Sequence, residues 1–297
     1  FIQAGDGGME YPMATLITGE RGLSSLVGVS IHELMHSWYQ MMLGTNESLY
    51  PWMDEGFTSF TEDEVQNYLR REGLLPGEPR DNPQQGSYAG YFALAGSGLE
   101  EPMSTHADHY QTNFAYGRAA YSKGAVFLSQ LSYIIGREAF DRGMLRYYDE
   151  WRFKHPNAND FIRVMEKESG LELDWYREYW VNTTHTIDYG IEGMEEAGAG
   201  ESTRITLTRV GAMPMPVDLM VTYQDGREEI IHIPLRIMRG AKPAEHTDRA
   251  FQVAEDWPWT HPVYELLLPV APGEISRLEI DPSGRMADVD RGNNVVE

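Results

Sequence analysis

Apolar residues recur at helical spacing through a long middle part of the chain, between Tyr116 and about Trp180. One face is formed by Ala125, Leu128, Leu131 and Ile135, and further helical groups follow at Phe140, Met144 and Tyr147 and then at Phe161, Val164 and Met165. Spacings of three and four residues place side chains on one face of a helix, where they can be buried together. We therefore predict that this region is mainly helical.

Two further helices are predicted closer to the N-terminus. The first covers Leu23 to Leu43 and stops at Gly44, and the second covers Trp52 to Arg71. Residues 73–98 are rich in glycine and proline, which predicts a loop or a loosely helical segment. Residues 1–22 hold short apolar runs among glycines, which predict strand-like structure.

The pattern changes after residue 182, and the acidic, glycine-containing stretch 191–200 is predicted to be a linker. Beyond it, short runs that alternate or are wholly apolar predict strands at 203–210, 217–224, 229–238, 264–270 and 277–280. Gln224–Arg227 contains Asp-Gly and favours a hairpin turn. We predict an α+β domain over residues 1–190 and a small antiparallel β-sandwich over residues 201–297.

The first two predicted helices carry a candidate metal site. His32 and His36 are four residues apart, so they share a helix face and can hold one metal ion together. Glu33 lies beside the first histidine and can reach a water on the metal without being a ligand. A lone H-E-x-x-H can arise by chance, but Glu55 follows at a spacing that lets it complete the site. Two histidines and one glutamate leave a zinc position open for water, which indicates catalysis.

Length and composition set further bounds. The chain has 297 residues, 41% of them hydrophobic, which is enough for two domains with a substantial core. No apolar run approaches the 18 or so residues of a membrane-spanning helix. The chain starts at Phe1 without a signal segment, so we interpret it as a piece of a longer protein or a processed one.

Charge excludes some partners. The net charge of -22 argues against nucleic acid and anionic membranes, because both require clustered lysine and arginine. Acidic, lysine-poor composition suits a protein in concentrated salt, but it equally suits an acidic protein from a GC-rich genome. The absence of cysteine leaves only histidine and carboxylate for zinc and does not assign the compartment. We expect a soluble protein and slightly favour an extracytoplasmic location.

Three motifs, in this order, resemble the gluzincin aminopeptidases of the aminopeptidase N and leukotriene-hydrolase type. Gly7–Pro12 resembles the G-x-M-E-N exopeptidase motif of that family, with Tyr11 in the place of asparagine. His32–His36 with Glu55 matches H-E-x-x-H followed by 18 residues and glutamate. Tyr121–Gly124 resembles the Y-E-K-G segment. The resemblance covers about residues 1–190.

The resemblance implies a thermolysin-like zinc metallopeptidase domain, in which a small mixed sheet is followed by helices, and then an all-β sandwich domain. It implies one Zn²⁺ per chain, bound by His32, His36 and Glu55. It implies hydrolysis of the N-terminal residue from peptides, with Glu33 as general base and acid. Family members normally carry a β-domain before the catalytic domain. This sequence lacks one, so an upstream domain of the same polypeptide is an expected partner.

Further residues take roles from the same resemblance. Tyr121 is expected to stabilise the tetrahedral intermediate, and Tyr116 is its competitor or a lining residue. Glu10 is expected to hold the substrate α-amine, with the backbone of Gly7, Gly8 and Met9 along the substrate.

Partners of the ligand histidines can be expected as well, because metal-bound histidines usually donate their other N–H to a carboxylate or carbonyl. Glu62 lies seven residues after Glu55, on the same helix face, and matches the family pattern. Asp54 is interpreted either as a second such group or as a surface acid.

Two other functions share these motifs. A thermolysin-like zinc endopeptidase would use the same ligands but leave Glu10 idle. A catalytically silent, peptide-binding relative would keep the fold without turnover, although ligands, base and tyrosine are all present here.

Overall fold

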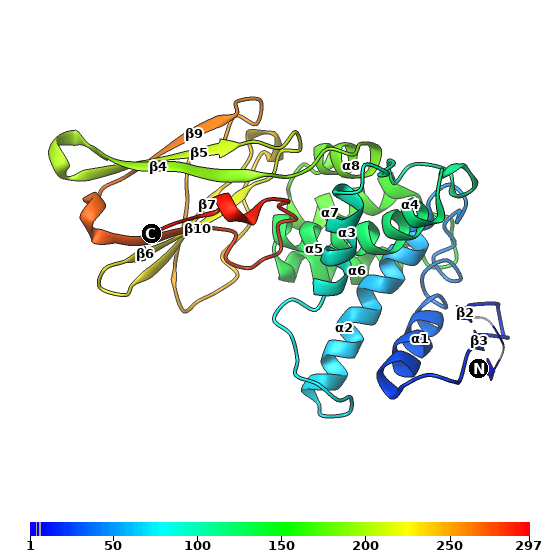
Figure 1. Ribbon diagram of the computed structural model, residues 1–297. Coiled ribbons are helices and arrows are strands. Elements are labelled where there is room, and N and C mark those ends of the chain that lie inside the picture. Colours follow the sequence, from blue (N-terminus) through cyan, green and yellow to red (C-terminus); the bar gives the residue numbers. More distant parts are fainter. Residues whose placement is uncertain (4, 6) are drawn as a thin grey trace. The chain divides into compact units, whose positions relative to one another are not determined.

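The computed structural model describes residues 1–3, 5 and 7–297 (Figure 1). The chain forms two compact units. The first comprises residues 1–129, 142–164 and 180–184, and the second comprises 130–141, 165–179 and 185–297. This division differs from the predicted boundary near residue 190, because helical segments join the second unit. The hydroxyl of Tyr133, for example, donates to the carbonyl of Pro216 at 3.2 Å.

The secondary structure follows the predicted order of a short sheet, helices and then strands. The α-helices are α1 (Leu23–Met35), α2 (Phe57–Arg71), α3 (Gln85–Ala95), α4 (Asn113–Gly117), α5 (Gly124–Ile135), α6 (Arg137–Trp151), α7 (Ala158–Ser169) and α8 (Asp174–Asn182). Two segments, η1 (Trp52–Gly56) and η3 (Arg118–Lys123), are π-helical. The 3₁₀ turns are η2 (Ala107–His109), η4 (Gly198–Gly200), η5 (Arg236–Met238), η6 (Pro272–Glu274) and η7 (Arg291–Asn293). None of the helices in the described part of the chain combines the length and apolar character needed to cross a bilayer.

The strands form three sheets among the described residues. They are β1 (Ile2–Gln3), β2 (Gly8–Met9), β3 (Leu16–Ile17), β4 (Tyr189–Ala197), β5 (Ser202–Arg209), β6 (Val217–Tyr223), β7 (Glu228–Ile233), β8 (Ala250–Val253), β9 (Val263–Leu268), β10 (Ile275–Ile280) and β11 (Val295–Val296). The N-terminal sheet has the order β1-β3-β2, with β1 parallel and β2 antiparallel to β3. The predicted small mixed sheet is therefore confirmed.

The first helix is shorter than predicted. It ends at Met35 rather than Leu43, and His36 is its C-cap in near-helical geometry. A helix continuous to Leu43 is excluded at Gln40, whose φ of +79° is not helical. The apolar residues that suggested a longer helix instead pack as turns, with Leu43 only 2% exposed.

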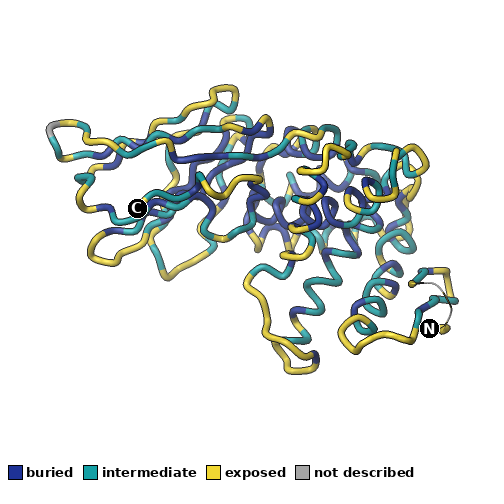
Figure 2. The backbone as a smooth tube through the Cα atoms, viewed as in Figure 1, coloured by how far each residue is buried: buried dark blue, intermediate teal, exposed yellow. Residues whose placement is uncertain are grey.

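The second predicted helix is confirmed from residue 52 to residue 71, although its first turn is the π-helical η1. Aromatic rings pack under it within the first unit. Phe57 lies with its ring centroid 4.9 Å from that of Phe161, and Trp52 lies 5.0 Å from Phe127. These fully buried rings fix η1 and the start of α2 against the helical core, which appears as dark blue tube in Figure 2.

The second unit contains the two larger sheets, with orders β11-β10-β6-β7-β8 and β4-β5-β9. Residues 191–197 are not a linker, as was predicted, but part of β4, which pairs antiparallel with β5. Their acidic side chains are consistent with a strand because Glu192, Glu195 and Glu196 are all exposed. The turn at Gln224–Arg227 joins β6 and β7 as predicted, with Gly226 at φ +84°. One pairing departs from the antiparallel prediction, since β7 and β8 run parallel.

A buried ion-pair network stabilises the second unit. The Lys242 ammonium donates to Asp218 at 2.6 Å and to Glu245 at 3.2 Å. The Arg285 guanidinium donates to both oxygens of Glu245, whose side chain is 15% exposed. Burial opposes ionisation of Glu245, but Arg285 and Lys242 outweigh it and lower its pKa to about 2.

We expect Glu245→Gln to destabilise the protein above about pH 4.5. A carboxyl whose pKa is lowered on folding contributes stability above its unfolded pKa and loses it as pH falls toward the folded pKa. The shift corresponds to roughly 3 kcal/mol at neutral pH. The variant should have a lower urea midpoint at pH 7, and its free energy of unfolding should depend less on pH between about pH 4.5 and 2. Glu201→Gln, at an exposed carboxyl of the same unit, is the control; an equal loss there would contradict the prediction.

Candidate metal centre

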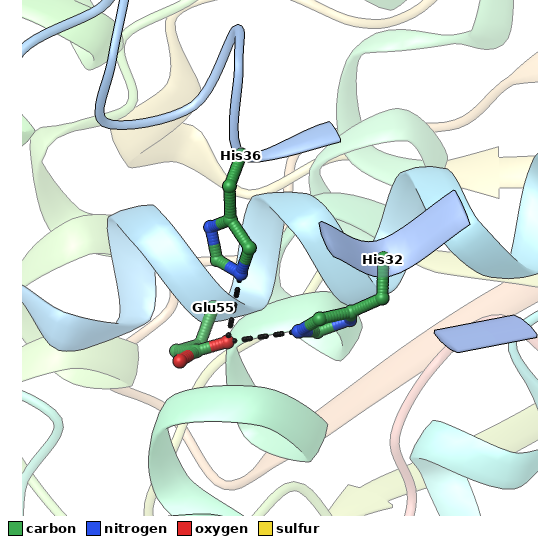
Figure 3. Close-up of side chains that lie close together, drawn as sticks. All are labelled: His32, His36 and Glu55. Atoms are coloured by element: carbon green, nitrogen blue, oxygen red, sulfur yellow. Dashed lines mark hydrogen bonds and ion pairs between the residues drawn. The ribbon is translucent and has the colours of Figure 1, made fainter. Parts of the chain in front are cut away.

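His32, His36 and Glu55 converge on one point (Figure 3). One Glu55 oxygen, Oε2, lies 3.1 Å from His32 Nε2 and 3.4 Å from His36 Nε2. The three potential ligand atoms all lie within 4.8 Å of one another. The sequence prediction that these three residues meet is consistent with this geometry.

Local structure explains the convergence. The end of α1 brings both histidines onto the same side, because residues four apart share a helix face. Glu55 comes from η1, the π-helical turn before α2. π-Helical turns in helices occur often at functional sites. Helices α1 and α2 lie side by side, so the three side chains meet between them (Figure 1).

The outer nitrogens of both rings have carboxylate partners. Nδ1 of His32 lies 3.1 Å from Glu62, and Nδ1 of His36 lies 2.6 Å from Asp54. Asp54 is 3% exposed, so it is not the surface acid that the sequence allowed. Such partners orient the ring and leave Nε2 free to face a metal. The donor set, its outer partners and its closeness therefore fit a zinc ion.

The site is acidic enough to charge both imidazoles. Burial lowers the pKa of His32, but hydrogen bonds to Glu55 and Glu62 outweigh it and raise it to about 9. Burial likewise opposes the charge on His36, whose pKa rises to about 11 through Asp54 and Glu55. The two histidines in turn outweigh the burial of Glu55 and lower its pKa to about 2. A cation would replace these protons, since ligand histidines must be neutral.

Glu33 lies beside this centre and is not one of its convergent ligands. Glu33 is 5% exposed, and its Oε2 atom has no hydrogen-bond partner within the described structure. Burial raises its pKa above the usual value, although the charges of His32 and His36 oppose this. The group packs over the backbone of Gly8, where an added Cβ would come within 2.7 Å of the carboxyl carbon. A glutamate in this setting can accept a proton.

Tyr121 points at the same centre from η3. Its hydroxyl donates to Glu55 Oε1 at 2.6 Å, and its ring stacks on that of His32 with centroids 5.8 Å apart. Burial, followed by the charge of Glu55, raises the pKa of Tyr121 well above its usual range, so the phenol stays protonated. Tyr116 is half-buried and its ring contacts that of Tyr110 at 5.7 Å. Among the described contacts, Tyr121 has a hydrogen bond to the centre and Tyr116 has none.

Glu10 directly follows β2, at the edge of the site. Glu10 is 7% exposed. One of its carboxylate oxygens lies within 4.8 Å of a His36 ring nitrogen and of an Asp54 oxygen. Gly8 and Met9 form the strand β2 that precedes it. Gly7 accepts a bond from the Arg21 guanidinium at 2.9 Å. Glu10 and β2 therefore lie where a ligand of the centre could contact them.

Sequence reasoning missed one acidic neighbour, Glu47, which follows the turns after α1. Partial burial of its carboxyl and the charge of Glu10 raise its pKa. Glu47 lies in an exposed loop with no motif around it, so no signal in the sequence could have found it.

Comparison with known proteins identifies the helical part of the chain. The sequence profile of the peptidase family M1 domain matches residues 13–180. The chain is 27% identical over 184 residues to aminopeptidase B from Rattus norvegicus, a match that covers 59% of this chain and 26% of the relative. It is 28% identical over 198 residues to leucine aminopeptidase 2 from Phaeosphaeria nodorum, covering 59% of this chain and 30% of the relative. The chain thus spans less than a third of the length of these relatives.

A solved structure shares the fold over nearly the whole chain. The crystal structure of Legionella pneumophila aminopeptidase A in complex with aspartic acid aligns with a TM-score of 0.61 and 14% identity. The alignment covers 95% of this chain and 30% of that one. It therefore includes both the helical region and the β-sandwich that follows.

Proposed function

Because the chain belongs to peptidase family M1, we propose that it is the catalytic part of a zinc-dependent aminopeptidase. The protein would remove the N-terminal residue from peptides that have a free amino terminus, using one Zn²⁺ per chain. The observation that carries the proposal is the convergence of His32, His36 and Glu55, with Glu33 buried beside them. A metal peptidase needs both a ligand set with an open position and a base close to it.

Glu33 would act as the proton carrier. When bound, zinc would polarise the scissile carbonyl and lower the pKa of water. Glu33 would accept the proton of the attacking water and pass it to the leaving amine. Its raised pKa supports this role, because a carboxyl that binds a proton more readily is better matched to transfer near neutral pH.

Tyr121 would donate a hydrogen bond to the oxygen that becomes negative during attack. Because the phenol is already held in place, little reorganisation is needed as the negative charge develops. One such donor contributes about 3 kcal/mol of transition-state stabilisation. Its present acceptor is Glu55 Oε1, so the O–H already points to the centre. Its raised pKa keeps the proton available.

Glu10 would hold the α-ammonium of the substrate. A fixed carboxylate at the edge of the centre would pair with the cation and place the first peptide bond near Glu33. The backbone of residues 7–9 would run along the substrate, and the charge of Glu47 would add to the negative potential at Glu10. A preceding domain, which we expect from the length of the relatives, would complete the binding pocket.

Paired substrates test the proposal. We expect aminoacyl-chromophore substrates to be hydrolysed by the zinc-loaded protein, and chelator to abolish the activity. The same substrates with an acetylated amine should react at least about 100-fold more slowly in kcat/KM, because a cation paired with a fixed carboxylate is lost. Glu10→Gln should remove most of this preference, while Glu20→Gln, an exposed glutamate of the same segment, should not.

Equal rates on free and acetylated substrates would instead favour the thermolysin-like endopeptidase. Because the chain spans under a third of its relatives, the panel should also be run on a longer polypeptide that includes any upstream domain. Zinc content with no turnover in either form would favour the catalytically silent relative.

A further inference from the structure

The two π-helical segments of the site touch each other through two glycines. Segment η1 carries Glu55 and ends at Gly56, while η3 carries Tyr121 and is followed directly by Gly124. A Cβ added to Gly56 would lie 2.6 Å from the Gly124 Cα. A Cβ added to Gly124 would lie 2.8 Å from the Gly56 Cα and 3.2 Å from the Trp52 carbonyl oxygen. The neighbouring atoms are backbone, which cannot move aside as a flexible side chain does.

Backbone conformation does not account for these glycines. Gly56 has φ −71° and ψ −40°, and Gly124 has φ −64° and ψ −44°. Any L-residue adopts these values, and alanine would favour a helix by about 1 kcal/mol over glycine. Only the space between the two segments requires the absence of a side chain. The contact therefore sets how closely η1 and η3 approach.

Segment η3 is held on another side by a third glycine. A Cβ on Gly90 of α3 would lie 2.8 Å from the Ser122 Cβ and would collide with the Ser122 hydroxyl. Lys123, fully buried, also anchors η3 through its ammonium, which donates to Glu100 at 2.7 Å. Tyr121 thus comes from a segment with little freedom to shift.

We infer that Gly56 and Gly124 are positioning residues that set the distance between the Glu55 carboxylate and the Tyr121 hydroxyl. The inference rests on the proposed function for its catalytic consequence. Both side chains come from the segments in contact, and their 2.6 Å hydrogen bond requires the backbones to approach this closely. A methyl group at either glycine pushes the segments apart. Displacement of Tyr121 then lowers the rate, and displacement of Glu55 weakens zinc binding.

The test is a cycle of Gly124→Ala with Tyr121→Phe. We expect Gly124→Ala to lower kcat by about 10- to 100-fold with KM within about threefold, because misplacement by about 1 Å costs a factor of this order. In the Tyr121→Phe background, where no hydroxyl remains to be misplaced, the same change should cost less than about threefold. The control is Gly86→Ala, since a Cβ on this helical glycine would meet nothing within 4 Å. Full activity of Gly124→Ala would overturn the inference. So would a double variant whose loss of kcat equals the product of the losses in the two single variants.

Zinc affinity provides a readout that does not depend on turnover. Competition with a chelator should show that Gly56→Ala binds zinc at least about tenfold more weakly, as for other changes that disturb a ligand's support. Gly86→Ala should bind as the unaltered protein does. If the unaltered protein binds zinc but hydrolyses no substrate, the proposed function fails while this comparison still decides the inference. Unchanged affinity in Gly56→Ala would then overturn it.

A compensating pair covers the case in which Gly124→Ala does not fold. Gly90→Ala introduces the clash with Ser122 from α3, and Ser122→Gly removes the obstructing side chain. We expect Gly90→Ala to lower kcat and the double variant to recover at least half of the lost activity. Failure of the second change to restore activity would show that the approach of η3 to its neighbours does not control the site.

Discussion

Replacing Glu33 by glutamine should leave zinc bound and reduce kcat by about 10³- to 10⁴-fold, the upper part of the range for general acid–base groups. Glutamine has nearly the same shape but cannot accept a proton at neutral pH. The ligand set of His32, His36 and Glu55 is untouched, so the metal content should not change. Single-turnover rates together with metal analysis on the same sample measure both quantities.

Two results would contradict this expectation. Retention of more than about a tenth of kcat would mean that another group carries the proton. Loss of zinc would mean that Glu33 supports the ligands rather than the reaction. Glu62→Gln is the informative comparison, because Glu62 bonds Nδ1 of His32 at 3.1 Å and should act mainly on zinc affinity.

The pairing of the two histidine ligands was predictable because it depends on short-range geometry. Residues four apart on a helix share a face whatever the rest of the fold does, so His32 and His36 could be paired from sequence alone. The family resemblance gave Tyr121 a role at the site, but its hydrogen bond to Glu55, across 66 positions, was not predicted and is seen only in the structure. The role of Asp54 could not be decided in advance, because a carboxylate has the same sequence signature whether it is buried or exposed.

Element boundaries were less predictable for a related reason. Residues 41–43 continue the apolar pattern of α1, yet the positive φ of Gln40 turns the chain, and tertiary contacts bury Leu43 without a helix. Residues 191–197 have the composition of a linker, but backbone pairing with β5 makes them a strand. Strand pairing depends on a partner elsewhere in the chain, and local composition carries little information about it.

The division into compact units shows the same limit. The pattern of apolar positions places the end of the helical region near residue 180, where α8 does end, at Asn182. It carries no information on which sheet a helix contacts. Tyr133, for example, donates its hydroxyl to Pro216 and accepts from the backbone N–H of Asp218, across more than 80 residues.

Replacing Tyr121 by phenylalanine should lower kcat by about 10²- to 10³-fold, the loss expected when one donor to a developing oxyanion is removed. KM should change little, because the hydrogen bond would strengthen only as charge develops. Tyr116→Phe is the matched control, since it removes a hydroxyl from the same helical stretch that has no described bond to Glu55, and it should cost less than about fivefold. Steady-state kinetics on one aminoacyl substrate measures both variants.

The opposite ranking of the two variants would assign the oxyanion donor to Tyr116. Zinc affinity must be measured on the same variant, because Tyr121 also bonds the proposed ligand Glu55. A fall in kcat at unchanged zinc affinity identifies a transition-state donor. A parallel fall in kcat and zinc affinity would mean that the hydroxyl serves only to orient Glu55.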